Sequence, residues 1–400
     1  MTSILAAPLT LPCGATLSNR LAKSAMSENL ADDHWPGERL RRLYARWGAS
    51  GAGLLLTGNV MVDARALGEP HNVVVENEAA HDPMARWAEA GQAAGAAVWP
   101  QLNHPGRQAI RAVSTQIVAP SAVPLKIGGG MFGVPRALEA GEIEVIVERF
   151  GRAAGVCKRA GFAGVQLHGA HGYLVSQFLS PLVNQRDDAW GGDAVRRRRF
   201  LVEVVRAMRA EVGSAYPIGV KLNSADFQRG GFDEDESMAV VGVLEAEGVD
   251  LLEISGGTYE RPAVTGTLPE QKASTAAREA YFLDYARKVR ARTGMPLLLT
   301  GGFRTRAGME GALASGAVDM VGVARPMALE PELPRGLLDG TVDQSRATLH
   351  LSGLKLLDGV SDIAWYGHQL RRLADGKEPD PSATTWGVLA RMGWAAATGR

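Results

Sequence analysis

The chain has little of what marks a disulfide, metal–thiolate or nucleic-acid-binding protein. Its 400 residues include two cysteines, Cys13 and Cys157, too few for a disulfide framework, a four-cysteine zinc site or an iron–sulfur cluster. The 43 basic and 43 acidic residues cancel, so no basic field for nucleic acid or lipid headgroups is indicated. No uncharged apolar run approaches the roughly 18 residues of a membrane span. We therefore expect a cytoplasmic protein that binds neither nucleic acid nor membrane.

What the sequence does contain is a repeated alternation of short apolar segments and longer segments with helical periodicity. The expected strands are 20–25, 53–58, 96–102, 164–169, 218–223, 249–255, 296–302 and 319–324. The expected helices are 37–49, 81–95, 142–160, 193–213, 234–247, 276–293 and 305–315. Eight such units predict an α/β fold, a single-domain (β/α)8 TIM barrel over 1–345. A doubly wound sheet is the alternative, but its first strand usually leads into a glycine-rich phosphate loop.

Two segments lie outside this repeat. Residues 103–141 are rich in Gly and Pro and predict a loop insertion after the third strand, above the carboxyl ends of the strands. Within them, "GGGMFG" (128–133) neither follows a strand nor opens a helix, so we interpret it as a flexible loop rather than a dinucleotide fingerprint. Residues 346–400 predict a C-terminal helical extension. It would pack on the barrel or on a second copy of the chain in a homo-oligomer.

Strand alternation indicates which polar side chains point into the barrel. Gln101, Gln166, His168 and Lys221 fall on inner faces, near the carboxyl ends of their strands, where barrel enzymes have their sites. An ammonium there requires an anion. Lys221 would meet either an internal carboxylate such as Glu253 or a ligand that carries negative charge.

The last two expected strands indicate phosphate binding. Gly301 and Gly302 end the seventh strand before a helix, and Arg325 ends the eighth, which is where this fold usually binds phosphate. An ordinary tight turn is the alternative for the two glycines.

The run "HGAHGYLVSQFLSPLVNQRDDAWGGD" (168–193) is the most specific pattern in the chain. Together with "LSNRLAKSAMSE" (17–28), "QLNHPGRQ" (101–108), "VKLNSADF" (220–227), "TGGFRT" (300–305) and "ARPM" (324–327), it resembles the Old Yellow Enzyme family of FMN-dependent ene-reductases. The resemblance covers roughly 1–345. It implies a barrel that holds FMN non-covalently, is reduced by NADH or NADPH, and transfers the hydride to an electron-poor alkene.

The resemblance also implies site residues. Those matching family positions that bind the cofactor are Ser24, Ala25, Met26, Ser27, Asn59, Gln101, Lys221, Gly301, Gly302, Ala324 and Arg325. Gln101 would meet the pyrimidine edge of the flavin, Lys221 its N1–O2 edge, and the last four the phosphate. The chain departs from the family in having Ser27 for threonine or cysteine, Asn29 for a tyrosine, Lys221 for arginine and Ala324 for glycine.

In a reaction of this kind, charge builds on the substrate carbonyl oxygen and a proton must reach the α-carbon. We therefore assign His168 and His171 to binding and polarising that oxygen, and Tyr173 to protonation after hydride leaves FMN N5. A flavin-dependent dehydrogenase of amines or ring C–C bonds is the first alternative. A metal-dependent hydrolase is the second, with His168, His171 and either Asp226 or Glu253 as ligands. We predict no metal.

Overall fold

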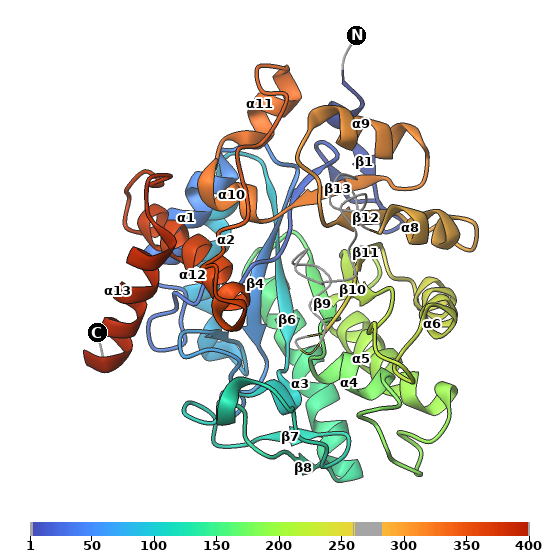
Figure 1. Ribbon diagram of the computed structural model, residues 1–400. Coiled ribbons are helices and arrows are strands. Elements are labelled where there is room, and N and C mark those ends of the chain that lie inside the picture. The colour runs from blue at the N-terminus through green and yellow to red at the C-terminus, as the bar shows by residue number, and fades with distance from the viewer. Residues whose placement is uncertain (1–2, 259, 261–281, 399–400) are drawn as a thin grey trace.

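Eight parallel strands close into a barrel in the computed structural model, which describes residues 3–258, 260 and 282–398. The strands are β3 (Leu21–Lys23), β4 (Leu54–Met61), β6 (Ala97–Asn103), β9 (Val165–Gly169), β10 (Ile218–Asn223), β11 (Leu251–Ser255), β12 (Leu297–Thr300) and β13 (Met320–Val323). Each pairs in parallel with its neighbour, and β3 closes the ring by pairing with both β13 and β4. The predicted (β/α)8 barrel is confirmed (Figure 1).

Helices follow the strands close to where the periodicity predicts them. Around the barrel lie α1 (Glu38–Gly48), α2 (His81–Gln92), α3 (Ala140–Arg159), α5 (Ala194–Val212), α6 (Glu234–Ala246), α8 (Leu283–Arg290) and α9 (Arg306–Ala314). The side chains of Asp193, Asp233 and Thr305 cap α5, α6 and α9 by accepting a backbone N–H of the first turn. The start of the helix expected over 276–293 lies outside the described residues, and its described part is α8. None of the described helices is long and apolar enough to cross a membrane.

The lower half of the barrel interior, at the amino ends of the strands, is apolar. Its buried side chains are Ala22, Leu54, Leu56, Trp99, Leu251, Leu298 and Met320. A hairpin of β1 (Leu9–Thr10) and β2 (Thr16–Leu17) adds leucines to the same cluster. Two glycines make room for the Trp99 ring. A Cβ on Gly164 would lie 2.4 Å from the ring, and a Cβ on Gly219 would lie 3.1 Å from it.

The insertion after β6 does not form one continuous lid. Its first residues, with η3 (Gly106–Gln108), reach the site, where the Gln108 side chain donates to the His171 carbonyl. Further along, Val123, Pro124 and Lys126 line a cavity beside the site. In the rest of the insertion, β7 (Val118–Ala119) pairs with β8 (Arg136–Ala137), and η4 (Gly128–Gly130) lies between these two strands within the GGGMFG segment. In the view of Figure 1, β7 and β8 lie at the lower rim of the molecule, near α3.

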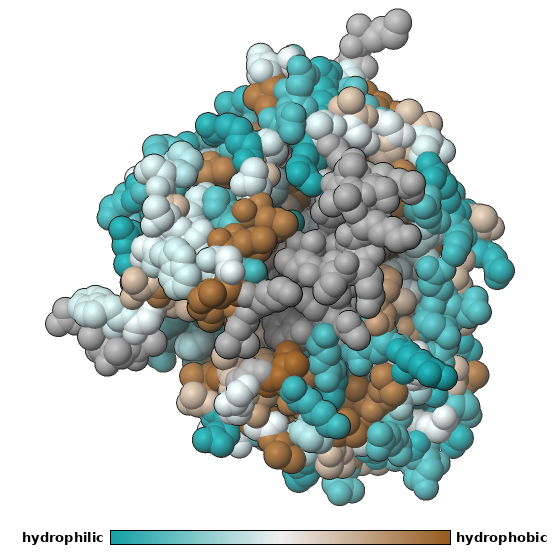
Figure 2. Space-filling view, viewed as in Figure 1, coloured by the Kyte–Doolittle hydropathy of each residue, from teal (hydrophilic) through white to brown (hydrophobic). Residues whose placement is uncertain are grey.

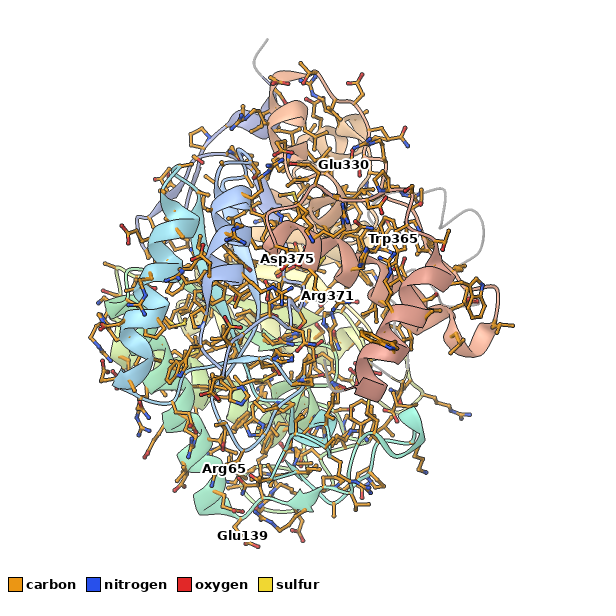
Figure 3. All side chains as sticks on the ribbon, turned by 90° about the vertical axis from the view of Figure 1, so that its left-hand side faces the viewer. Arg65, Glu139, Glu330, Trp365, Arg371 and Asp375 are labelled. Carbon is orange, nitrogen blue, oxygen red and sulfur yellow. The ribbon has the colours of Figure 1, made fainter. Side chains whose placement is uncertain are left out.

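The C-terminal helices lie beside the first helix of the barrel. α12 (Lys355–Ala374) ends next to α1, where Asp375 accepts from the Arg39 side chain at 2.9 Å (Figure 3). α10 (Arg325–Leu329) and α11 (Leu333–Asp339) precede it, and α13 (Thr385–Thr398) comes after it. Apolar side chains are exposed around the start of α12: Leu349, Leu351, Leu354, Val360 and Ile363. Figure 2 shows brown, apolar patches in the part of the view where Figure 1 labels α12. The boundary at residue 345 and a homo-oligomer stay predictions.

Candidate active site

The carboxyl ends of the strands form the one end of the barrel where predicted site residues are partly exposed. The strands themselves are almost wholly buried, but the residues just after them are only half-buried: Ala25, Met26 and Ser27 after β3, Gly301 and Gly302 after β12, and Ala324 and Arg325 after β13. Asn59 in β4 and His171 after β9 are also half-buried. The structure thus gathers these separate segments around one opening.

Below this opening, buried polar side chains form a connected network across the barrel. Gln101 donates to Gln166 at 2.6 Å, and Gln166 donates to Glu253 at 2.8 Å. The other oxygen of Glu253 accepts from Thr300 at 2.7 Å, and the Thr300 hydroxyl lies 2.6 Å from that of Ser24. Four strands, together with Ser24 directly after β3, therefore contribute to one layer of hydrogen bonds, which fixes the orientation of Gln101.

Lys221 belongs to the same layer. Its ammonium lies 3.1 Å from a Glu253 oxygen, and both side chains are at most 4% exposed. The internal carboxylate partner, one of the two alternatives for Lys221, is therefore present. The Glu253 carboxylate offsets the positive charge of Lys221 that the sequence analysis assigned to the flavin. Contact between Lys221 and the flavin therefore stays a proposal.

The rings of His168, His171 and Tyr173 come together above this layer. Their centroids are 5.1 Å apart for the two histidines and 4.8 Å apart for His168 and Tyr173. Asn59 of β4 donates to the Tyr173 hydroxyl oxygen at 3.2 Å. A donor in this position stabilises the oxygen after it has given up a proton.

Both imidazoles are neutral at neutral pH. Burial, together with the charges of His171 and Lys221 as smaller causes, holds the pKa of His168 well below its usual value. Burial and Lys221 have the same effect on the pKa of His171. The Nδ1 atom of His168 accepts from the Ala170 N–H at 3.2 Å, which assigns the ring hydrogen to Nε2. His168 can thus donate one hydrogen bond without carrying charge.

The backbone at His171 is strained. Its φ is 61°, in the left-handed region that few residues other than glycine adopt. The residue is held on both sides, because His171 N–H donates to Asn223 at 3.2 Å and its Nε2 lies 2.8 Å from the Ser255 hydroxyl. Such strain is common at functional sites, where surrounding contacts maintain it.

The loops after β12 and β13 have the geometry expected of an anion site. Gly301 and Gly302 have φ of 126° and 88°, and helix α9 comes next with its N-terminal N–H groups. Arg325 stands at the start of α10, and one of its terminal nitrogens lies 2.9 Å from Asp362 of α12. The C-terminal extension therefore contacts the predicted phosphate arginine, a contact that no sequence motif indicated.

The donors and acceptors at this opening fit a flavin. Asn59 Oδ1 and both polar side-chain atoms of Asn103 are buried without a hydrogen-bond partner among the described residues. Both asparagines lie near the carboxyl ends of neighbouring strands, β4 and β6, beside Gln101. An isoalloxazine ring presents an edge of alternating donors and acceptors that such amides can satisfy. Asn59, Gln101 and Ser27 would face the ring, and Gly301, Gly302 and Arg325 the phosphate.

The structure also reveals site residues that the sequence did not. Glu69, in the connection after β4, is hydrogen-bonded to the Ser27 hydroxyl. Ser255 and Asn223 hold His171. Glu253 and Ser255 alternate along β11, and this alternation could have placed Ser255 on the inner face. Glu69 lies in a loop, where no periodicity indicates which way a side chain points. Among the described residues, no three His, Cys, Asp or Glu side chains gather as a metal would require, so neither Asp226 nor Glu253 joins the histidine pair.

A cavity of about 180 Å³ adjoins the site. Gly172 and Thr258 are part of its lining, and Thr258 forms a parallel β-bridge with His171. Arg107, paired with Glu260 at 2.7 Å, is also part of the lining. Polar and apolar groups share the lining about equally, so this space suits a ligand that carries both kinds of group.

Comparison with known proteins decides the family. Residues 5–344 match the model of the NADH:flavin oxidoreductase / NADH oxidase family. The chain belongs to this family. An NADH-dependent flavin oxidoreductase of Hypocrea jecorina, iliE, is 41% identical over 368 residues, which are 86% of this chain and 91% of that protein.

Solved structures agree with this family assignment. The old yellow enzyme homologue from Zymomonas mobilis superposes with a TM-score of 0.72 at 25% identity, over 86% of this chain and 94% of that one. Morphinone reductase in complex with tetrahydroNAD gives 0.71 at 27% identity, over 86% and 92%. The resemblance to Old Yellow Enzyme is confirmed, and with it an FMN-dependent oxidoreductase that uses NADH. The use of NADPH stays a prediction.

Proposed function

We propose that this flavin oxidoreductase reduces the C=C bond of α,β-unsaturated carbonyl compounds. The observation that supports this most is the cluster of His168, His171 and Tyr173, two neutral imidazoles and a phenol in which neighbouring ring centroids lie within 5.1 Å. The cluster stands above a polar layer that fits a flavin. Bound FMN, reduced by NADH, supplies the hydride, and the protein side chains bind the substrate and deliver the proton.

His168 and His171 bind the substrate carbonyl oxygen. Each imidazole has one N–H, and donors aimed at an oxygen that gains negative charge lower the barrier most when they carry no hydration shell. Burial of both rings meets that condition. The charged His171 form would bind an anion more strongly, but burial and Lys221 disfavour it.

Tyr173 gives the proton that completes the reaction at the α-carbon. The phenol bears a hydrogen to transfer, and the Asn59 amide donates to the same oxygen. The Asn59 contact supports the oxygen as negative charge develops on it. Solvent then returns the proton to Tyr173 before the next turnover.

Anaerobic half-reactions test the proposal. NADH should bleach the bound flavin, and a cyclic enone should then restore its colour, whereas a primary or tertiary amine should reduce no flavin. If the amine reduces the flavin and the enone fails to reoxidise it, the dehydrogenase alternative replaces the proposal. The family assignment favours flavin chemistry over the metal-dependent hydrolase alternative.

A further inference from the structure

Ser27 is bound to a carboxylate that comes from a distant part of the chain. Its hydroxyl is hydrogen-bonded to Glu69, 42 residues away in the connection after β4. Asn72 holds Glu69 in place from both sides, since its Oδ1 accepts the Glu69 backbone N–H at 2.7 Å and its Nδ2 lies 3.4 Å from the carboxylate. Asn72 is itself buried. The pairing of Ser27 with Glu69 is therefore part of a fixed structure at the rim of the barrel opening.

A second carboxylate, Glu28, lies directly behind this pair. It accepts from the Gly58 N–H at 2.9 Å and from the Tyr44 hydroxyl, and its oxygen lies 3.6 Å from the buried Lys23 ammonium. These donors stabilise a negative charge on Glu28. Burial, reinforced by that charge, raises the pKa of Glu69 to about 7.

The remaining groups around Glu69 do not offset this effect. Lys23 and Tyr44 face Glu28 rather than Glu69. On the opposite side, the His34 ring contacts the Asn72 carbonyl at 3.1 Å, and His71 is exposed. Glu69 thus has a serine hydroxyl and an amide as its polar side-chain partners, and the charge that acts on it is that of Glu28.

A serine hydroxyl has one hydrogen, and this limits what Ser27 can offer a ligand. When Glu69 is ionised, it can only accept, so Ser27 gives its hydrogen to Glu69 and presents lone pairs to the opening. When Glu69 is protonated, the carboxylic acid can donate to Ser27 Oγ, and the Ser27 hydrogen turns toward the opening. The change requires one proton from solvent and no redox step.

We propose that Glu69 is a positioning residue that reverses the hydrogen-bond polarity of Ser27 toward the flavin. The inference rests on the proposed function in one respect, that a flavin is bound at this opening with Ser27 facing its ring. A donor at a flavin carbonyl stabilises the electron-rich reduced form, and an acceptor there destabilises it. The reduction potential of the bound flavin should therefore depend on the protonation of Glu69 through Ser27.

The test measures the absorption spectrum and midpoint potential of the FMN-loaded protein between pH 5.5 and 9. The wild type should show an inflection near pH 7 beyond the slope expected of the flavin itself. Glu69→Gln, Ser27→Ala and their combination should abolish it, and Ser27→Thr, which keeps the hydroxyl, should retain it. Glu78→Gln, on the surface, serves as the matched control and should behave as wild type.

Two outcomes would overturn the proposal. One is a wild-type protein without the inflection. The other is an inflection that survives in Ser27→Ala, since Glu69 would then act through its charge and not through the hydroxyl.

The failure of the proposed function would look different, because no alkene enters this test. A protein that shows the inflection but does not reduce enones refutes the substrate and leaves the positioning role standing. Infrared titration of the Glu69 carboxyl, identified by its loss in Glu69→Gln, needs no flavin. In it, Ser27→Ala should raise the midpoint by about one pH unit, because the carboxylate loses a donor. An unchanged midpoint would count against the pairing.

Discussion

The two halves of the barrel interior differ in chemistry although the same eight strands build both. The lower half is filled by Trp99, leucines and Met320, with Gly164 directly before β9 and Gly219 of β10 making room for the indole. One step further along the strands, the same inner faces carry Ser24, Gln101, Gln166, Lys221, Glu253 and Thr300. In the lower layer, close packing of apolar side chains stabilises the barrel. In the upper layer, hydrogen bonds hold polar side chains in fixed orientations. We therefore expect binding and chemistry in this protein to depend on the upper layer and its rim, and stability to depend on the lower layer.

The largest effect should come from removing Tyr173, the proposed proton donor at the rim. We expect Tyr173→Phe to lower kcat for enone reduction by about 10²–10⁴-fold, the usual contribution of a positioned acid. Reduction of the flavin by NADH needs no proton from Tyr173 and should keep its rate. Stopped-flow measurement of the two half-reactions separates these effects. Equal losses in both would show that the substitution disturbs the site as a whole.

In the lower layer, Trp99→Ala should lower the free energy of unfolding and leave kcat nearly unchanged. Removal of a buried indole typically lowers the free energy of unfolding by about 3–5 kcal/mol. Urea unfolding measures this loss, and kcat per FMN-loaded molecule at low temperature should stay close to wild type. A large loss of kcat with unchanged stability would reverse the roles assigned to the two layers.

The polar layer should tolerate paired changes better than single ones. Glu253→Gln leaves the buried Lys221 ammonium without a charged partner, which typically costs about 3–5 kcal/mol, and Lys221→Met leaves Glu253 in the same position. The double variant should recover much of that loss in urea unfolding. Additive losses would mean that the 3.1 Å pair contributes no coupling.

The smallest expected effect is a pH dependence of stability. His168 and His171 have a folded-state pKa well below the usual value, so they stay neutral in the folded protein while the unfolded chain takes up protons below about pH 6.5. Their stabilising contribution is present above that pH and is lost as pH falls, at up to roughly 1.4 kcal/mol per pH unit for each. In the apo protein, His168→Asn should have a shallower slope between pH 6.5 and 5 than the wild type. Equal slopes would show that His168 is protonated in the folded state.

The lower layer and the strands were predictable from the sequence because both depend on short-range periodicity. Alternation along single strands correctly placed Gln166, His168 and Lys221 on the inner face, and the position of Glu253 on the next strand suggested its pairing with Lys221. The rim was less predictable, because its residues lie in loops. The pairing of Ser27 with Glu69, and of Arg325 with Asp362, joins segments 42 and 37 residues apart that no periodicity relates. The left-handed backbone of His171 depends on its surroundings as well, since nothing in "AHG" requires it.

The central claim, that the polar half of the barrel reduces an activated alkene, is tested most directly by where two hydrogens arrive. NADH-reduced protein is mixed anaerobically with 2-cyclohexenone in D₂O, and the product is examined by NMR. We expect the flavin to be reoxidised and the product to be a saturated ketone with one deuterium at the α-carbon, because the proton comes from an acid in exchange with solvent. A reduced flavin that the enone leaves unoxidised, or a saturated ketone without deuterium at the α-carbon, would contradict the claim.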